Sequence, residues 1–171
     1  MKARPITLPA FGAIIPGQGG ILAAILRGPI VEGVEQPPFA LLVSDAAAGE
    51  IEDIAWGEYG KDVPGTSSRT DGKANTDAMV LANCPAALRV RELTIDGHSD
   101  WYLPSLGELN SAAANVPELF STDDWYWTST QDSRGTAFVQ GFEDGYSHWY
   151  DKVNGPRVRA FRRISLDLLT P

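Results

Sequence analysis

Cysteine is nearly absent from this sequence: Cys84 is the only one in 171 residues. A single cysteine excludes an internal disulfide framework and a thiolate metal cluster, and its alanine- and leucine-rich surroundings favour a small buried apolar role. Long apolar runs are also missing, and none approaches the ~18 residues of a membrane-spanning helix, so we expect no membrane insertion. Pro5, Pro9 and Pro16 interrupt the N-terminal region. We therefore expect no signal peptide and synthesis in a cytoplasm.

Histidine is scarce as well. His98 and His148 are fifty residues apart, which excludes a local histidine-rich metal motif. The sequence has no phosphate-binding loop, no serine-hydrolase elbow and no zinc-protease helix motif. No nucleophile can be paired with a base. We expect a non-enzymatic protein without a metal or another cofactor.

Positive charge is in the minority, with 14 lysines and arginines against 22 acidic residues and a net charge of -8. Most of the excess negative charge lies in residues 32–62, which contain eight acidic residues and a single basic one, Lys61. Such a surface repels the phosphate backbone, so nucleic acid is not the expected partner.

The length is that of one domain with a core of its own. Residues 1–18 are punctuated by proline and read as an extended arm for attachment to a partner, and residues 19–171 as the domain. Seventeen glycines and twelve prolines favour many turns and short strands over long helices.

Apolar runs of strand length cover residues 19–27 and 39–44, and a further strand over 50–57 ends at Trp56. Runs this short can be strands or buried helix, and the flanking glycines and prolines favour strands. A helix is predicted from Asn75 to about residue 96, with Pro85 interrupting or restarting it.

The stretch from Asp100 to Leu109 combines a short buried strand, a proline and a helix start. Ser105 and Glu108 have the spacing of a capping box, which predicts a helix from Leu106 to about Asn115.

The C-terminal part changes to the alternation of strands. Four strands are predicted, over residues 125–130, 136–142, 146–152 and 157–164, as an antiparallel meander. Together with the helices, this pattern predicts an α+β fold dominated by β-structure.

Asp144-Gly145 is a strong signal for a two-residue hairpin turn. That turn would pair Glu143 with Tyr146, Gln140 with Trp149 and Val139 with Tyr150. One face then gathers Phe138, Gln140, Phe142, Ser147 and Trp149, and the other gathers Ala137, Val139, Gly141, Glu143, Tyr146, His148 and Tyr150.

The face with the larger apolar rings, which includes Trp149, is predicted to be core. The opposite face is predicted to be a ligand-binding surface, because tyrosine combines a large contact area with a polar tip. The candidate ligand-binding residues are Tyr146, His148, Tyr150 and Glu143, with Asp132 and Arg134 in a bordering polar loop. The alternative is that both faces are buried between layers.

The motifs DWYLPSLGEL, WYWTSTQ, AFVQGF-EDG and RVRAFRR resemble the Lcl C-terminal-domain-like family, a branch of the C-type-lectin-like fold. The earlier pieces GQGGILAAILRG, FALLV and TDGKANTDAMV are similar to members encoded in tailed phages and prophages, so the resemblance spans roughly Gly17 to Arg163. The Glu-Pro-Asn and Gln-Pro-Asp signatures of calcium-dependent sugar-binding lectins are missing. The cysteine chemistry of the related formylglycine-generating enzymes does not fit a lone Cys84.

The resemblance implies a lectin-like scaffold that displays a recognition surface. We expect a bacteriophage tail-tip or tail-fibre protein, located in the virion, that contacts the bacterial host surface. Its expected partners are other phage tail proteins, bound through the arm, and a host surface glycan or protein, with a homo-oligomer as a further possibility. The alternatives are a purely structural tail or baseplate decoration protein and a bacterial surface adhesin.

Overall fold

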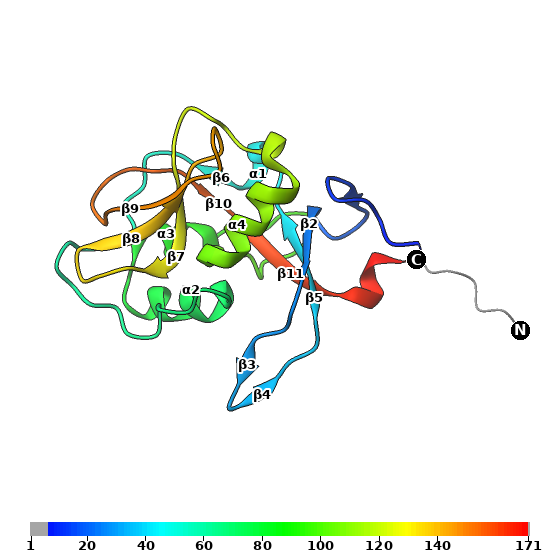
Figure 1. Ribbon diagram of the computed structural model, residues 1–171, viewed down its shortest axis with the longest axis horizontal. Helices are drawn as coiled ribbons and strands as arrows, with labels where there is room; N and C mark the ends of the chain where they lie inside the picture. Colours follow the sequence, from blue (N-terminus) through cyan, green and yellow to red (C-terminus); the bar gives the residue numbers. More distant parts are fainter. Residues whose placement is uncertain (1–6, 171) are drawn as a thin grey trace, which may run out of the picture.

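The computed structural model describes residues 7–170, which form an α+β fold with antiparallel sheets (Figure 1). The predicted α+β class is thereby confirmed. The strands are β1 (Ile14–Ile15), β2 (Gly20–Leu26), β3 (Ile30–Val31), β4 (Val34–Glu35), β5 (Phe39–Val43), β6 (Glu50–Ile51), β7 (Tyr126–Gln131), β8 (Thr136–Gln140), β9 (Ser147–Asp151), β10 (Val158–Arg159) and β11 (Phe161–Ser165). The helices are α1 (Ala46–Gly49), α2 (Gly72–Leu81), α3 (Pro85–Arg91) and α4 (Leu106–Asn115), with 3-10 turns at Pro117–Leu119 and Leu166–Leu169.

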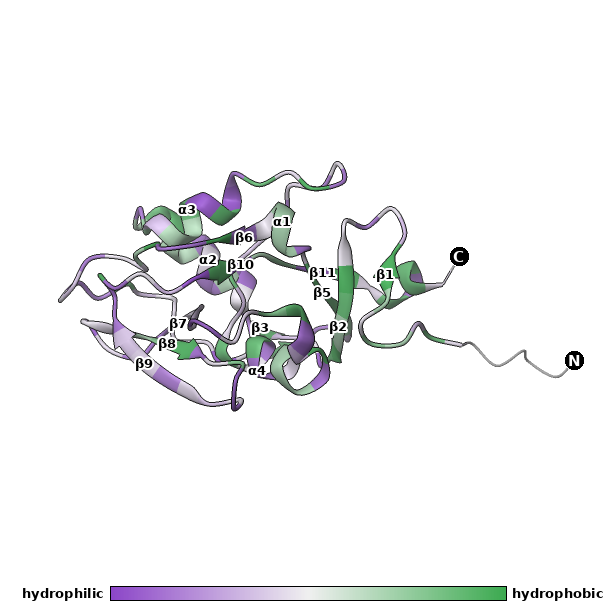
Figure 2. Ribbon diagram, turned by 90° about the horizontal axis from the view of Figure 1, so that it is seen from above, coloured by the Kyte–Doolittle hydropathy of each residue, from purple (hydrophilic) through white to green (hydrophobic). Residues whose placement is uncertain are grey.

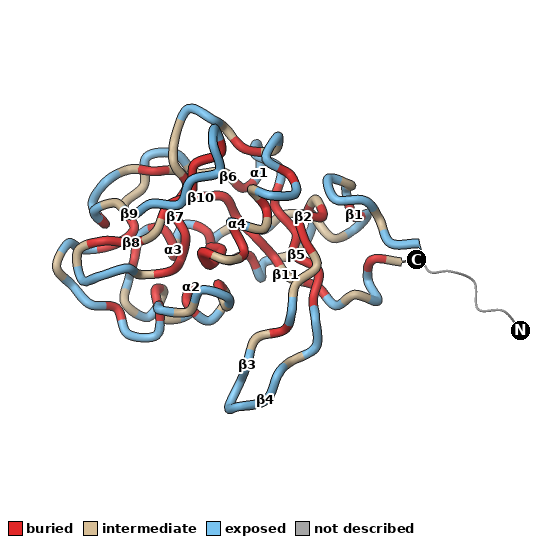
Figure 3. The backbone as a smooth tube through the Cα atoms, viewed as in Figure 1, coloured by how far each residue is buried: buried red, intermediate tan, exposed pale blue. Residues whose placement is uncertain are grey.

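Two sheets dominate the fold. One has the strand order β1-β2-β5-β11 and the other the order β7-β8-β9, and the pairs β3-β4 and β6-β10 complete the set. Helix α4 contacts β2 of the first sheet as well as β7 and β8 of the second, and α2 packs against β7. The buried backbone lies between these elements, whereas β9 and the β3–β4 hairpin are exposed (Figure 3).

The corner before α4 follows the sequence prediction. Ser105 and Glu108 form the predicted capping box, and the helix runs from Leu106 to Asn115. Trp101 and Leu103 are fully buried, but the only pairing here is an isolated bridge between Tyr102 and Phe161. The helix start is thus correct, and the preceding segment is buried chain rather than a strand.

The single helix predicted from Asn75 is two helices in the structure. Helix α2 starts earlier, at Gly72, because the Asp71 side chain accepts a hydrogen bond from Ala74 N and caps it. Asn83 then adopts a left-handed conformation with φ of 57°, and Pro85 begins α3. Proline is favoured at the first position of a helix, where its missing N–H costs no hydrogen bond, and is disfavoured in the interior of a helix.

The predicted strand over residues 50–57 is wrong beyond its first two residues. Asp53 has a positive φ of 49°, which ends the extended chain after β6. Trp56 is nevertheless fully buried, and its Nε1 donates a hydrogen bond to Thr128 O at 2.8 Å. This hydrogen bond to β7, and not pairing with a neighbouring strand, therefore holds the loop around Trp56 in position.

The predicted four-stranded C-terminal meander is wrong in its last strand. Strands β7, β8 and β9 form a meander, but Phe161–Ser165 pairs with β5 and Val158–Arg159 pairs with β6. The last strand thereby places Phe161 in the core shared with α4, where it is fully buried. Strand β11 therefore belongs to the sheet of β5 and not to that of β9, although it follows β9 closely in the sequence.

The predicted arm does not extend to residue 18. Ile14–Ile15 forms β1 on the edge of β2, and Ile15 is 3 % exposed. Gly12 N also donates to Leu22 O at 2.8 Å. The part of the arm from Gly12 onward is therefore built into the domain, and residues 1–6 lie outside the described residues.

The β3–β4 hairpin, which the sequence analysis did not predict, projects from the body (Figure 1). Its two turn residues, Glu32 and Gly33, both have positive φ, at 49° and 78°. At its base, a Cβ on Gly28 would lie 1.9 Å from Gln36 O, so only glycine allows the two chains to approach this closely.

Candidate functional site at the β8–β9 turn

The β8–β9 hairpin has a different register from the predicted one. Trp149 pairs with Phe138, and Tyr150 pairs with Ala137, which is a shift of two residues. The shift arises because the ladder ends at Gly141, whose N–H donates to Tyr146 O at 2.8 Å, so the turn is longer than Asp144-Gly145.

A shift of two leaves the same residues together on each face, but burial differs between the strands and not between the faces: β8 is buried on both faces, whereas four of the five residues of β9 are exposed. Ala137 and Val139 are fully buried in the cluster that contains Trp127, whereas Trp149 is 49 % exposed. The prediction that Trp149 belongs to the core is therefore wrong. Gln140 is also fully buried, on the face that carries Trp149, so the alternative that both faces are buried holds for the central strand β8, and the outer strand β9 is the exposed one.

The predicted ligand-binding residues of this hairpin have unequal exposure. Tyr146 is 68 % exposed, and Glu143 and His148 are also exposed. Tyr150 is half-buried and packs against the Trp127 cluster. Tyr146, His148 and Glu143 can therefore meet a ligand directly, and Tyr150 mainly supports its neighbours.

Trp125, which the sequence analysis did not single out, organises this end of the hairpin. Its ring centroid lies 5.5 Å from that of Tyr150 and 6.2 Å from that of His148. A Cβ on Gly141 would lie 3.1 Å from the Trp125 ring, so the absence of a side chain there allows the indole to sit against the β8–β9 turn. The Gly141 position in the alternating strand was the available signal for this close approach.

A cleft opens beside Trp125, with a volume of about 160 Å³. It is lined by Thr122, Asp123, Asp124, Trp125, Gly141, Phe142, Glu143 and Asp144. Asp124 lies 3.7 Å from Arg157 Nε, and Asp144 accepts a hydrogen bond from Tyr146 N at 3.1 Å. Within residues 7–170, Asp123 and Glu143 take part in no ion pair. Among the described residues, the cleft therefore offers three carboxylates that form no ion pair, those of Asp123, Glu143 and Asp144, next to an indole.

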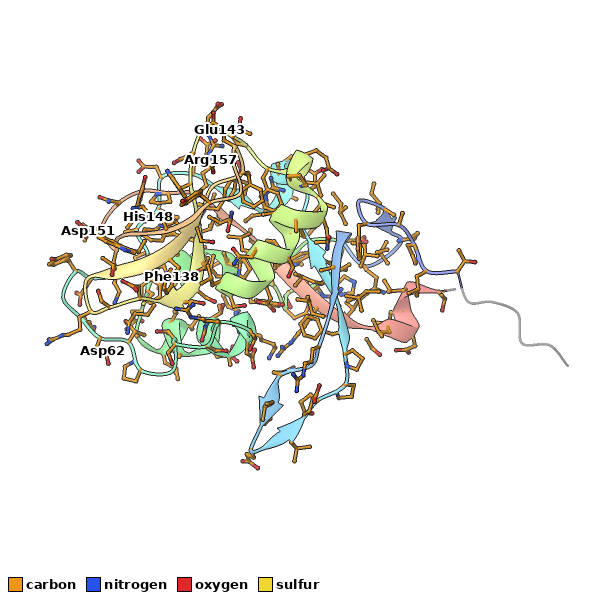
Figure 4. The ribbon with its side chains drawn as sticks, in the orientation of Figure 1. Asp62, Phe138, Glu143, His148, Asp151 and Arg157 are labelled. Atoms are coloured by element: carbon orange, nitrogen blue, oxygen red, sulfur yellow. The ribbon has the colours of Figure 1, made fainter. Side chains whose placement is uncertain are left out.

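Asp132 and Arg134 do not border this cleft. They belong to the β7–β8 turn, which lies at the other end of β8. Asp132 Oδ2 accepts a hydrogen bond from Thr136 Oγ1, and Arg134 Nε donates one to Gly60 O. Figure 4 shows the separation, because Glu143 and Asp62, which bonds to the end of β7, lie at opposite ends of the hairpin. The prediction that Asp132 and Arg134 border the ligand-binding residues is therefore wrong, because both belong to the turn at the opposite end of β8.

A partly buried ionic network lies next to the cleft, which it reaches at Asp124. Glu50 accepts hydrogen bonds from Arg157 Nη1 at 2.8 Å, Arg159 Nη2 at 2.7 Å and Tyr126 Oη at 2.7 Å. Burial by itself raises the pKa of Glu50, but the hydrogen bonds from Tyr126, Arg157 and Arg159 together outweigh it and hold that pKa below its ordinary value. Burial, and after it the bond to Glu50, raises the pKa of Tyr126 to about 12. The network fixes Arg157 and, through it, the Asp124 side of the cleft.

The remaining titratable groups of chemical interest are structural. Cys84 is buried, and burial raises the pKa of its thiol. Lys152 is also buried; its Nζ donates to Lys61 O and Gln131 Oε1 and lies 4.7 Å from the Trp56 ring centre.

Residues 7–170 contain no group of three or more histidine, cysteine, aspartate or glutamate side chains arranged to hold a metal ion. The described part of the chain has no helix that is both long and apolar enough to cross a membrane.

Comparison with known proteins gives a likeness of fold only. No protein-family model matches the chain, and no curated protein matches it. The chain is similar to the crystal structure of a fimbrial protein from Bacteroides ovatus, with a TM-score of 0.52 and 13 % sequence identity. The similarity covers 88 % of this chain and 44 % of the fimbrial protein, so the chain spans less than half of that structure.

Proposed function

We propose that this chain is a non-enzymatic recognition module with a C-type-lectin-like fold, related to the Lcl C-terminal-domain-like family, that contacts a bacterial surface from the tail tip or tail fibre of a bacteriophage. Its motifs around residues 100–109 and 125–131 support the family. The α+β arrangement of short antiparallel strands around a buried, capped helix is compatible with that fold.

The cleft beside Trp125 is the observation that carries the proposal. Asp123 and Glu143 supply acceptor oxygens, Trp125 supplies an apolar ring, and Tyr146 adds an exposed ring with a hydroxyl tip. Carboxylates accept hydrogen bonds from hydroxyl groups, and aromatic faces pack on the C–H groups of a sugar ring. A hydroxyl-rich ligand fits both kinds of group.

The size of the cleft limits what it can hold. Its volume of about 160 Å³ is smaller than the ~300–1,000 Å³ of typical small-molecule pockets. The cleft therefore suits one terminal residue of a surface glycan, and the exposed Tyr146 and His148 suit contacts around it. The likeness to a fimbrial protein is compatible with surface contact as a role.

Attachment to the virion requires a second surface. Leu8, Phe11 and Ile14 are 46 %, 48 % and 74 % exposed, and they lie in the N-terminal part of the described chain. Figure 1 shows this segment on the side of the molecule away from β9. The module can therefore be held by its N-terminal segment while the cleft points outward.

Binding of the purified, labelled chain to susceptible and resistant bacterial cells tests the function. Tyr146→Ala and Glu143→Gln should each weaken binding to susceptible cells about tenfold, as loss of a contact residue at a small interface does. Leu81→Ala is the matched control, because Leu81 is 86 % exposed on α2 and remote from the cleft.

Equal binding of the chain to both kinds of cell, or normal binding by both variants, would contradict recognition through the cleft. A chain that enters virus particles but never binds cells would instead support a structural tail or baseplate decoration. A chain found on the bacterial surface would support an adhesin.

A further inference from the structure

A second cavity lies where the chain passes from α2 to α3. The two helices lie next to one another in perpendicular views (Figures 1 and 2), and residues 82–84 join them. The cavity has a volume of about 370 Å³, against about 160 Å³ for the cleft beside Trp125. This volume falls within the ~300–1,000 Å³ of typical small-molecule pockets. The cavity is lined by Gly57, Glu58, Lys61, Val63, Ala82, Asn83, Cys84 and Pro85.

Hydrogen bonds fix both walls of this cavity. On one side, Cys84 N donates to Met79 O at 2.9 Å after the left-handed turn at Asn83. On the other side, Val63 N donates to Gln131 Oε1 at 2.9 Å. A Cβ at position 57 would lie 3.3 Å from Cys84 Sγ, so the glycine there leaves the space between the walls open. The cavity is therefore formed before any ligand enters.

A buried cation lies against the inner wall. Lys152 is fully buried, and its Nζ donates to Lys61 O at 2.8 Å and to Gln131 Oε1 at 2.7 Å. Lys61 lines the cavity, and Gln131 Oε1 also holds the lining residue Val63, so these bonds place Nζ beside the cavity. Both acceptors are uncharged, and within residues 7–170 Lys152 takes part in no ion pair. Buried charges in proteins are normally paired, and the nearby Trp56 ring offsets only part of the cost.

The charges around the cavity favour an anion inside it. Burial raises the pKa of the Cys84 thiol, whereas the charges of Lys152 and then Lys61 lower it, and Glu58 raises it with a smaller effect. The two ammonium groups therefore act on this lining position more strongly than the carboxylate does. Glu58 is the single acidic residue of the described lining; its side chain is 76 % exposed and is paired with Lys61 at 3.3 Å.

We propose that this cavity binds a small organic carboxylate, whose negative charge lies near Lys152 and Lys61. Such an anion would supply the counter-charge that Lys152 lacks among the described residues. The side-chain amide of Asn83 is exposed and has no hydrogen-bond partner within residues 7–170, so it can donate to the carboxylate. The hydrocarbon part of the ligand would rest on the apolar lining, which consists of Val63, Ala82 and Pro85. An apolar lining favours such an organic anion over inorganic phosphate.

Titration of the isotope-labelled chain with sodium propionate, followed by its amide NMR signals, tests the site. We expect saturable shifts at Lys61, Val63, Asn83 and Cys84, with a dissociation constant on the order of 1–10 mM for a ligand of so few atoms. Sodium chloride at the same ionic strength should not produce them. Propionamide has nearly the same shape without the charge, and it should bind about tenfold more weakly.

Three variants separate the charge from the space. Lys152→Met removes the buried charge and should raise the dissociation constant for propionate about tenfold. Lys73→Met is the matched control, because it removes an exposed ammonium group at the other end of α2 and should change nothing. Ala82→Leu fills the cavity and should prevent binding.

The proposal is overturned if no saturable shift occurs up to ~50 mM propionate, well above the expected dissociation constant. It is also overturned if propionamide binds as tightly as propionate, or if Lys152→Met or Ala82→Leu binds propionate as the wild-type chain does. If Lys152→Met does not fold, the comparison of propionate with propionamide on the wild-type chain decides.

Discussion

Glu108 is the side chain on which the starts of two helices depend. It is 1 % exposed, and its Oε2 accepts hydrogen bonds from Ser105 N at 2.8 Å and Gly72 N at 3.1 Å. Its Oε1 accepts a third from Tyr102 Oη at 2.8 Å. One buried carboxylate thus joins the beginnings of α2 and α4 to the segment that precedes α4.

Replacing Glu108 with alanine leaves three donors unpaired in the interior. Each buried unpaired donor costs ~1–3 kcal/mol, and water entering the space left by the side chain offsets part of the sum, so we expect Glu108→Ala to lower the free energy of unfolding by about 4 kcal/mol. For a chain of this size that corresponds to a fall in melting temperature of roughly 8–16 °C. Glu108→Gln keeps one acceptor oxygen but turns an amide N–H₂ toward a donor, and should cost about 2 kcal/mol.

The pH dependence gives a second readout. Burial raises the pKa of Glu108 above its ordinary value of 4.5. The folded protein therefore keeps this proton where the unfolded chain has released it. The stabilisation is fully present below the unfolded pKa and is lost as pH rises through the folded pKa. Glu108→Gln should remove this part of the pH dependence.

Urea unfolding followed by tryptophan fluorescence, between about pH 4 and 7, measures both effects. Glu92→Ala is the control, because Glu92 makes an exposed ion pair with Arg89 that should contribute less than ~1 kcal/mol. A Glu108→Ala protein as stable as the control would refute the assignment of Glu108 as the shared cap of both helices.

Two further predictions concern the hairpin and the ionic network. Trp149→Ala should change the free energy of unfolding by less than ~1 kcal/mol, whereas Trp127→Ala should cost ~3–5 kcal/mol, because Trp127 is buried and Trp149 is not. Chemical denaturation measures both values. A larger loss for Trp149→Ala than for Trp127→Ala would show that Trp149, and not Trp127, belongs to the core. Because the pKa of Glu50 is lowered in the folded protein, its stabilising effect is present above the unfolded pKa and lost as pH falls through the folded pKa. Glu50→Gln should flatten the decline of melting temperature on the acid side, and an unchanged acid slope would count against the network.

Local patterns predicted the elements whose causes are local. The capping box of Ser105 and Glu108 satisfies backbone groups within one turn, so four residues suffice to start α4 at Leu106. Proline at the start of α3 acts in the same way. The three strands of the β7–β9 meander also follow from alternation and turn residues alone.

The same local reasoning failed for the hairpin register and its faces. Asp144-Gly145 is a good two-residue turn, but Gly141 admits the Trp125 ring, and the ladder ends before that turn. Both sides of β8 are buried, because β8 lies between β7 and β9, and the outer strand β9 is the exposed one. A comparison of the apolar area of the two faces could not show this, because burial follows the place of each strand in the sheet.

Of the candidate site residues, too, the sequence predicted some correctly and placed others wrongly. Glu143, Tyr146 and His148 could be proposed from the hairpin alone, because they surround its turn. Asp132 and Arg134 were placed beside them in error, since a strand separates the two turns.

The sequence by itself determined the α+β class, the capped helix and the approximate strands, because each depends on neighbours along the chain. Only the tertiary structure decided that β11 joins β5, that Trp149 is exposed and that Trp125 and Glu143 line one cleft. These outcomes depend on which distant side chains fill the space around each element, and short-range patterns carry no information about that space.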